Sequence, residues 1–298
     1  MTATWRQVAR KDLEDAARSR LVWGIVVVYV GFLAMALASA EQLFPPEVAV
    51  TPRRALAGVA QLSQLFLPGV ALVVGYAAVV GERRDGSLRV LLSYPFSRRD
   101  VVLGKLLGRS AVTVLGLAVS YAVASVLVVG LYGAPDAWTF AGFVGAGVLL
   151  GLAFTGLAVG GSAASATRTR AMALTAGAFV AMVFFWKPAV VGLYYLKNGS
   201  VPGLVAERWY FLVKRLNPLE AFRVVSTAAL DQRVAAFPRL PLEDVPMRAA
   251  AETLAIGNRV AGEVPLSLEP WFAAVVLVAW GTVPLLVGLR RFERADLG

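Results

Sequence analysis

The sequence predicts an all-α membrane protein, and two observations lead to this fold class. The 298 residues are 58% hydrophobic with a mean hydropathy of +0.68, above the roughly 45–50% apolar content of a soluble domain. Six apolar stretches each reach the length of about 20 residues that a helix needs to cross a bilayer. We therefore expect a single transmembrane domain over residues 1–298, with six transmembrane helices and an N-terminal interfacial helix.

Residues 4–20 predict an amphipathic helix that lies on the membrane surface before the first span. Apolar side chains such as Trp5, Val8 and Leu13 fall on one side at helical spacing, and Arg6 and Arg10 lie on the other. The alternative is a helix that packs against another subunit.

The six predicted spans are separated by loops rich in proline, glycine or charge. Their expected bounds are about 21–40, 55–80, 106–131, 139–163, 171–191 and 271–289. Gln61, Ser63 and Gln64 lie near the outer end of the second span, where polar side chains either form hydrogen bonds between helices or line a substrate path.

Small residues recur four positions apart at the start of the third span and within the fourth. The Gly-x-x-x-Gly spacing leaves one face of a helix without side chains and lets a neighbouring helix approach closely. We expect helix-packing positions at Gly104, Gly108, Gly147, Gly151, Gly156 and Gly160.

The charged loop over residues 81–105 predicts two short helices joined at Pro95. Ser87 is a good N-cap for the first, which carries leucines on one face. Ser97 and Asp100 have the spacing of a capping box, so a second helix begins there. The first helix has only about two turns, which is marginal in isolation; it either docks against a partner or lies on the lipid headgroups.

The largest extramembrane region, residues 197–269, contains one clear helix start. Asn217 is a good N-cap, Pro218 suits the first helical position and Glu220 lies two residues further on. Because apolar side chains follow at helical spacing, we expect this helix to lie across the outer surface.

The distribution of basic residues predicts that both termini are cytoplasmic. Seventeen lysines and arginines fall in the segments assigned to the inside, whereas the two short outer loops hold only Arg53 and Arg54. Of the ten remaining basic residues, nine lie in the long outer loop, which is exempt from this rule, and Lys187 lies near the outer end of the fifth span. The net charge of +10 is thereby explained by topology, and no nucleic-acid partner is expected.

Several function classes are disfavoured by what the chain lacks. It has no cysteine and no histidine, which removes thiol and imidazole catalysis, and its soft ligands are five methionines, so we expect no metal site. Gly104-Lys105 is followed by leucine, so there is no phosphate-binding loop. No Asp, Glu, Lys or Arg lies mid-span to carry a coupling ion. We expect a chain that is not an enzyme, and if it transports actively the energy comes from another polypeptide.

The charged loop over residues 81–105 resembles a loop of a known protein family. Its run Glu-x-x-x-Gly-Ser-Leu-x-x-Leu-Leu-Ser-x-Pro-x-Ser-Arg, residues 82–98, followed by Gly104-Lys105, is similar to the first cytoplasmic loop of ABC-2 type permeases, the membrane subunits of ATP-binding-cassette (ABC) transporters. Ser87 stands where the family usually has threonine, and Tyr94 and Phe96 replace smaller residues. The resemblance implies a cytoplasmic coupling helix that sits in a cleft of a separate ATPase subunit, two permease copies as a homodimer or heterodimer, ATP and Mg²⁺ on the ATPase, and export.

On this resemblance we expect Glu82 to anchor the loop, the leucines to enter the ATPase cleft and the arginines to orient the contact. The ATPase-coupling residues are then Glu82, Gly86, Ser87, Leu88, Arg89, Leu91, Leu92, Pro95, Ser97, Arg98 and Arg99. Asn217, Pro218 and Arg223 resemble a signal of the sub-branch of permeases for nitrous-oxide-reductase maturation.

Two other function classes stay open at this point. One is a non-transporting membrane scaffold or sensor that binds a partner through the loop 197–269. The other is a membrane-embedded enzyme acting on lipids, which is disfavoured because the acidic pair Glu243 and Asp244 lies in a proline-rich loop. The transported substrate does not follow from the sequence.

Overall fold

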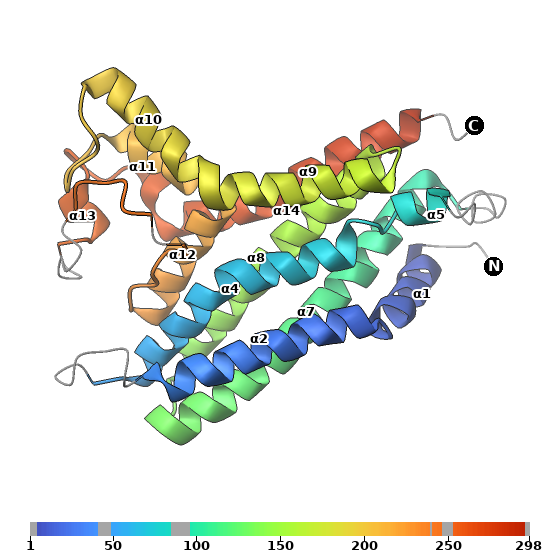
Figure 1. Ribbon diagram of the computed structural model, residues 1–298, viewed down its shortest axis with the longest axis horizontal. Coiled ribbons are helices and arrows are strands. Elements are labelled where there is room, and N and C mark those ends of the chain that lie inside the picture. Colours follow the sequence, from blue (N-terminus) through green and yellow to red (C-terminus); the bar gives the residue numbers. More distant parts are fainter. Residues whose placement is uncertain (1–4, 41–48, 85–95, 239, 246–252, 296–298) are drawn as a thin grey trace.

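The computed structural model describes residues 5–40, 49–84, 96–238, 240–245 and 253–295. The long helices run side by side, and the two termini lie at the same end of the bundle (Figure 1). We call this end the termini end and the opposite end the far end. An even number of spans requires both termini on one side, so this arrangement agrees with six crossings.

The fold class is confirmed: the described residues form helices joined by loops, with one isolated β-bridge between Ala206 and Val260. The helices are α1 Trp5–Ala17, α2 Arg20–Ala38, α4 Pro52–Gly75, α5 Val80–Arg84, α7 Arg98–Tyr132, α8 Ala137–Ala164, α9 Arg168–Val180, the π-helix η1 Ala181–Phe185, α10 Trp186–Asn198, α11 Arg208–Arg215, α12 Pro218–Leu230, α13 Ile256–Arg259, the 3₁₀ turn η2 Leu266–Leu268 and α14 Pro270–Arg294.

Six helices are long and apolar enough to cross a membrane. They are Arg20–Ala38, Pro52–Arg83, Arg98–Tyr132, Ala137–Ala164, Arg168–Asn198 and Pro270–Arg294. The third is longer than predicted because the helix that begins after Ser97 runs without a break into the span. The fifth is longer because it continues through the π-turn at Ala181–Phe185 to Asn198.

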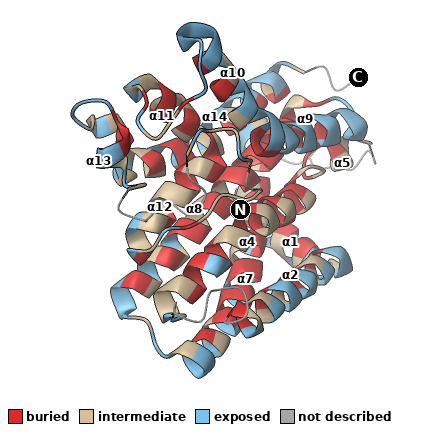
Figure 2. Ribbon diagram, turned by 60° about the vertical axis from the view of Figure 1, so that its left-hand side comes forward, coloured by how far each residue is buried: buried red, intermediate tan, exposed pale blue. Residues whose placement is uncertain are grey.

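α8 lies at the centre of the bundle, and its glycines bring α14 into backbone contact. A Cβ atom added to Gly156 would overlap the carbonyl oxygen of Gly281, and one at Gly160 would overlap that of Pro284. Buried residues concentrate on α4 and α8, whereas α2, α9 and α10 show many exposed ones (Figure 2). The exposed side chains on α2 and α10 include Val27, Met35, Leu193 and Leu196, which suits helices that face lipid.

The helix α12 begins as predicted but lies elsewhere. Asn217 is its N-cap and accepts a hydrogen bond from the Leu219 amide at 2.8 Å, with Pro218 next. The helix does not lie across a surface: it packs against α4, α8 and α14, and Phe222 and Leu230 are fully buried. The difference arises because its apolar side chains fit between three spans. Glu220 and Arg223 pair with each other at 2.6 Å.

Candidate functional site at the termini end

At the termini end, α1 packs directly on the first turns of α7. A Cβ at Gly104 would lie 2.5 Å from the Cβ of Val8, and one at Gly108 would lie 2.8 Å from a carboxylate oxygen of Asp12. Glycine is therefore required at both positions for the helices to come this close. The buried face of α1 is Val8, Asp12 and Ala16, so the predicted surface helix is also a packed helix, and its buried face includes an acid.

Asp12 forms the centre of a buried charge cluster. Its carboxylate is 1% exposed and lies 2.7 Å from the Lys105 ammonium and 2.8 Å from the Nε of Arg109. Lys105 also lies 2.5 Å from a carboxylate oxygen of Glu82 on α5. The Nη2 of Arg109 donates to Asp12 at 2.9 Å, and its Nη1 donates to the Val74 carbonyl on α4 at 2.9 Å. Two acids balance two bases, which is what burial of charge demands.

A second set of contacts ties the start of α7 to the end of α14. Arg98 donates to the carbonyl oxygens of Phe292, Glu293 and Ala295 at 2.6, 2.9 and 2.7 Å. Arg99 pairs with the Glu293 carboxylate at 2.6 Å. A cation at the carbonyl end of a helix is stabilising because those carbonyls have no partner within the helix.

The capping box predicted at Ser97 is confirmed. The Ser97 hydroxyl accepts from the Asp100 amide at 3.1 Å, and the Asp100 carboxylate accepts from the Ser97 amide at 3.0 Å. Both sides of the segment 85–95 are thus fixed, by Glu82 on one side and by Ser97, Arg98 and Arg99 on the other. The other predicted coupling residues, Gly86, Ser87, Leu88, Arg89, Leu91, Leu92 and Pro95, lie outside the described residues.

Comparison with known proteins decides the family. The profile described as ABC-2 family transporter protein matches residues 6–297. The chain belongs to this family. It is similar to the probable ABC transporter permease protein NosY of Pseudomonas aeruginosa, with 29% identity over 266 residues that cover 86% of this chain and 93% of the relative. The protein of the same name from Stutzerimonas stutzeri is 28% identical over 260 residues, 84% of this chain and 91% of the relative.

The chain is therefore an ABC transporter permease subunit, a multi-pass membrane protein and not itself the catalytic subunit. Its family implies an associated ATP-binding subunit. Within the part of the permease that the structure describes, no group of three or more His, Cys, Asp or Glu side chains is placed to hold a metal ion.

Sequence reasoning missed three residues of the charge cluster, Asp12, Lys105 and Arg109. A signal was present in the run Gly104-Lys105-Leu106-Leu107-Gly108-Arg109, where a cation follows each glycine of the packing motif. A helix that docks on the two glycines also lies close to the two cations, so an acid on its docking face can pair with them. Asp12, between Val8 and Ala16 at four-residue spacing, is that acid.

Hydroxyl groups form hydrogen bonds between the spans of the permease deeper in the bundle. Ser63 on α4 bonds Tyr29 on α2 at 2.7 Å and Tyr121 on α7 at 3.0 Å, and Thr113 bonds Thr155 at 3.1 Å. For Ser63 the structure favours interhelical bonding. The glycines of α8 leave room for these side chains: Gly147 faces the Tyr121 ring and Gly151 faces Thr113.

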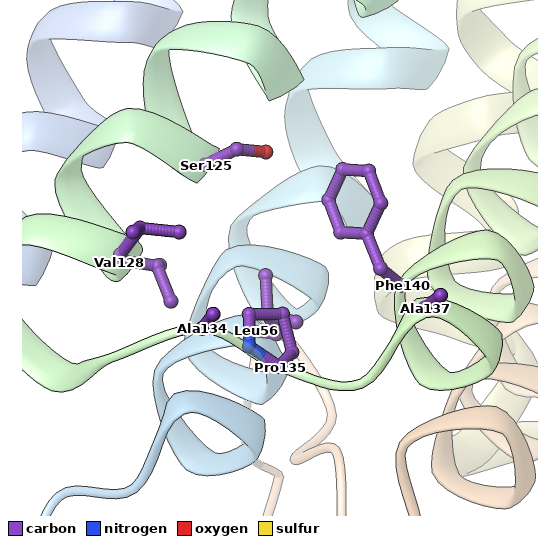
Figure 3. Close-up of a pocket in the computed structure, with 8 residues that line it drawn as sticks. Leu56, Ser125, Val128, Ala134, Pro135, Ala137 and Phe140 are labelled. Atoms are coloured by element: carbon purple, nitrogen blue, oxygen red, sulfur yellow. The ribbon is translucent and has the colours of Figure 1, made fainter.

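An apolar pocket of about 260 Å³ lies at the far end between α4, α7 and the turn into α8 (Figure 3). Leu56, Val128, Pro135 and Phe140 contribute to its walls, and Ser125 supplies a hydroxyl. None of the lining residues that the structure describes is ionisable, and these residues offer hydrocarbon contact.

Proposed function

We propose that this permease forms the membrane pathway of an ABC exporter and that residues 85–95 hold the coupling helix moved by a separate ATP-binding subunit. One observation supports this most directly: the residues on both sides of that segment are tied into the bundle by buried or multiple contacts. Because both ends of the segment are fixed in this way, a displacement of the segment would be transmitted to the bundle. It would reach α1, α7 and α14 together.

The contacts define how such a displacement would spread. Glu82 pulls on Lys105 and, through Asp12, on α1. Arg98 and Arg99 pull on the end of α14, and the glycine contacts pass that motion to α8. Breaking a buried ion pair costs about 3–5 kcal/mol, so the cluster would move as a unit while the spans change their angles.

The termini end is assigned to the cytoplasm. Its supporting evidence is the excess of lysine and arginine in the short segments at this end. ATP and Mg²⁺ would be bound by the partner subunit, and two permease copies, identical or related, would assemble around the pathway.

The test is purification of the tagged protein from its native membrane, with identification of what accompanies it. A stoichiometric ATP-binding subunit is expected with the wild type. It should be lost when Leu88→Asp and Leu92→Asp are combined, because charge replaces the two leucines expected to dock. Leu266→Asp is the matched control, since Leu266 is 74% exposed at the far end. An ATPase that is retained by the double variant, with full transport, would contradict the coupling assignment.

The scaffold or sensor alternative has one observation in its favour. The far-end region has its own hydrophobic core, in which Tyr194, Tyr210, Phe211, Val260 and Leu268 are buried, and this core would hold a partner-binding surface in a fixed shape. If no ATP-binding subunit is recovered even after crosslinking, this function replaces the exporter.

A further inference from the structure

A non-helical segment crosses the far end of the bundle after α12. We call residues 232–238 and 240–245 the strap. Val234 is fully buried in the main core, and its amide donates to the Thr227 hydroxyl at 3.1 Å. The strap therefore enters the space between the spans instead of passing over them.

The first half of the strap is held by an amide side chain of the second span. Gln64 on α4 donates to the Ala235 carbonyl at 2.8 Å and accepts from the Phe237 amide at 3.3 Å. Gln61 donates to the Ala236 carbonyl at 3.4 Å. A side-chain amide that donates to one backbone carbonyl and accepts from a nearby backbone amide pairs both groups, as a neighbouring β-strand would. Gln64 does this, and Gln61 adds one donated bond, so both glutamines of the second span bond the strap.

The second half of the strap is held by α10 and α11. Lys187 on α10 donates to the Leu240 carbonyl at 2.6 Å. The Glu243 carboxylate pairs with Lys214, accepts from the Tyr210 hydroxyl and lies 3.5 Å from Arg259. The Asp244 amide donates to the Pro202 carbonyl at 3.0 Å. The strap thus connects α4 with α10, the second span with the fifth.

The fifth span is the one that most needs such a connection. Only 22% of its most apolar window is buried, against 61% for the second span and 67% for the fourth. It contains a π-turn at Ala181–Phe185, and Asn217 donates to the Met182 carbonyl there at 2.7 Å. π-turns leave a helix locally less regular and often mark functional positions. A span with little side-chain packing and a π-turn can tilt once its polar ties are released.

We propose that the strap is a releasable latch that joins α4 to α10 at the far end and opens when the two spans separate for cargo to leave. The opening in response to ATP rests on the proposed function; the latch does not. Apart from the buried Val234, the contacts named here for the strap are hydrogen bonds and one carboxylate among cations, which water replaces on opening. The α8–α14 contact is backbone packing through glycine, which has no such replacement.

The test measures the distance between α4 and α10 in the assembled protein. The chain has no cysteine, so Gly58→Cys and Gly192→Cys carry spin labels without background. A Cβ at either glycine meets no atom within 4 Å, so both changes are tolerated. Double electron–electron resonance is recorded in lipid nanodiscs, with labelled protein diluted in unlabelled protein to isolate distances within one chain.

The latch is loosened by Glu243→Gln, and Glu207→Gln is the matched control. Glu207 also pairs with a lysine at the far end, Lys197 at 2.5 Å, but does not contact the strap. Glu243→Gln is expected to shift the distance distribution to longer values without nucleotide, and Glu207→Gln to leave it as in the wild type. Lys187→Met provides a second route, because it removes the contact with Leu240, and the same shift is expected.

The outcomes separate the two proposals. If the Glu243→Gln and Lys187→Met proteins, folded and inserted, keep the wild-type distance, the latch is overturned. If they shift but no ATP-binding subunit accompanies the permease, the latch stands and the exporter proposal fails. With the subunit present, ATP and vanadate should lengthen the distance in the wild type. An unchanged distance in a complex that hydrolyses ATP would exclude release of the latch during transport.

Discussion

The buried charges of the termini end lie on helices, whereas those of the far end lie partly on the strap, which is not helical. Asp12 and Glu82 are balanced by Lys105 and Arg109, all held by helices that are continuous with or packed against spans. Glu243 lies on the strap and pairs with Lys214 and Arg259. The same chemistry thus gives a stiff connection at one end and a separable one at the other, because the backbone that carries the charge differs.

The largest expected effect comes from removing the acid at the stiff end. Asp12→Ala leaves the ammonium of Lys105 and the guanidinium of Arg109 with fewer partners in a buried site, and we expect a loss of about 3–5 kcal/mol in the free energy of unfolding. Chemical denaturation in detergent measures it. Asp15→Ala, at an exposed position of the same helix, is the control. Equal stability of the two variants would show that the cluster is not a structural unit.

The next effect tests the glycine contact that joins α8 to α14. Gly156→Ala would drive a methyl group into the carbonyl of Gly281, and overpacking of this kind costs about 1–3 kcal/mol. Gly145→Ala on the same helix meets open space and should be neutral or slightly stabilising. Thermal unfolding of the two variants in the same detergent compares them. A neutral Gly156→Ala would mean that the contact is looser than the geometry indicates.

A smaller, local effect is expected at the strap. Gln64→Leu leaves the Ala235 carbonyl and the Phe237 amide without a partner, at a local cost of about 1–3 kcal/mol. Amide hydrogen exchange should accelerate over residues 234–237 and stay unchanged in α8. Gln61→Leu, which removes only the 3.4 Å contact with Ala236, should have a weaker effect. Acceleration spread over the whole bundle would show that the strap is part of the core and not a latch.

The smallest effect concerns pH. Burial raises the pKa of Glu243, but the charges of Lys214 and Lys187 and the hydrogen bonds from Lys214 and Tyr210 outweigh it and lower the pKa from 4.5 to about 2. A carboxyl with a lowered pKa stabilises the fold fully above 4.5, and this contribution disappears as the pH falls through about 2. The α4–α10 distance should therefore be the same at pH 7 and pH 5. A longer distance at pH 5 would contradict the charged state of Glu243.

The sequence by itself determined the number of spans, the fold class and the local helix starts. Hydrophobic length, the Ser97–Asp100 capping box and the Asn217-Pro218 start depend on residues within a few positions of each other, so they can be read along the chain. The loop motif with Glu82 at its start was also local, and it pointed to the family that the comparisons then gave.

The tertiary structure decided which elements meet. Asp12 and Lys105 are 93 positions apart, Gln64 and Ala235 are 171 apart, and no local pattern pairs them. The glycine spacing predicted close approach, but it did not say that α1 would dock on Gly104 and Gly108 or α14 on Gly156 and Gly160. α12 was expected on the surface because its sequence is amphipathic. The same pattern also suits a helix between spans, and the shape of the surrounding spans decides between the two positions. Burial of charge and backbone depends on partners distant in sequence, which is why the stiff cluster and the strap appear only in the fold.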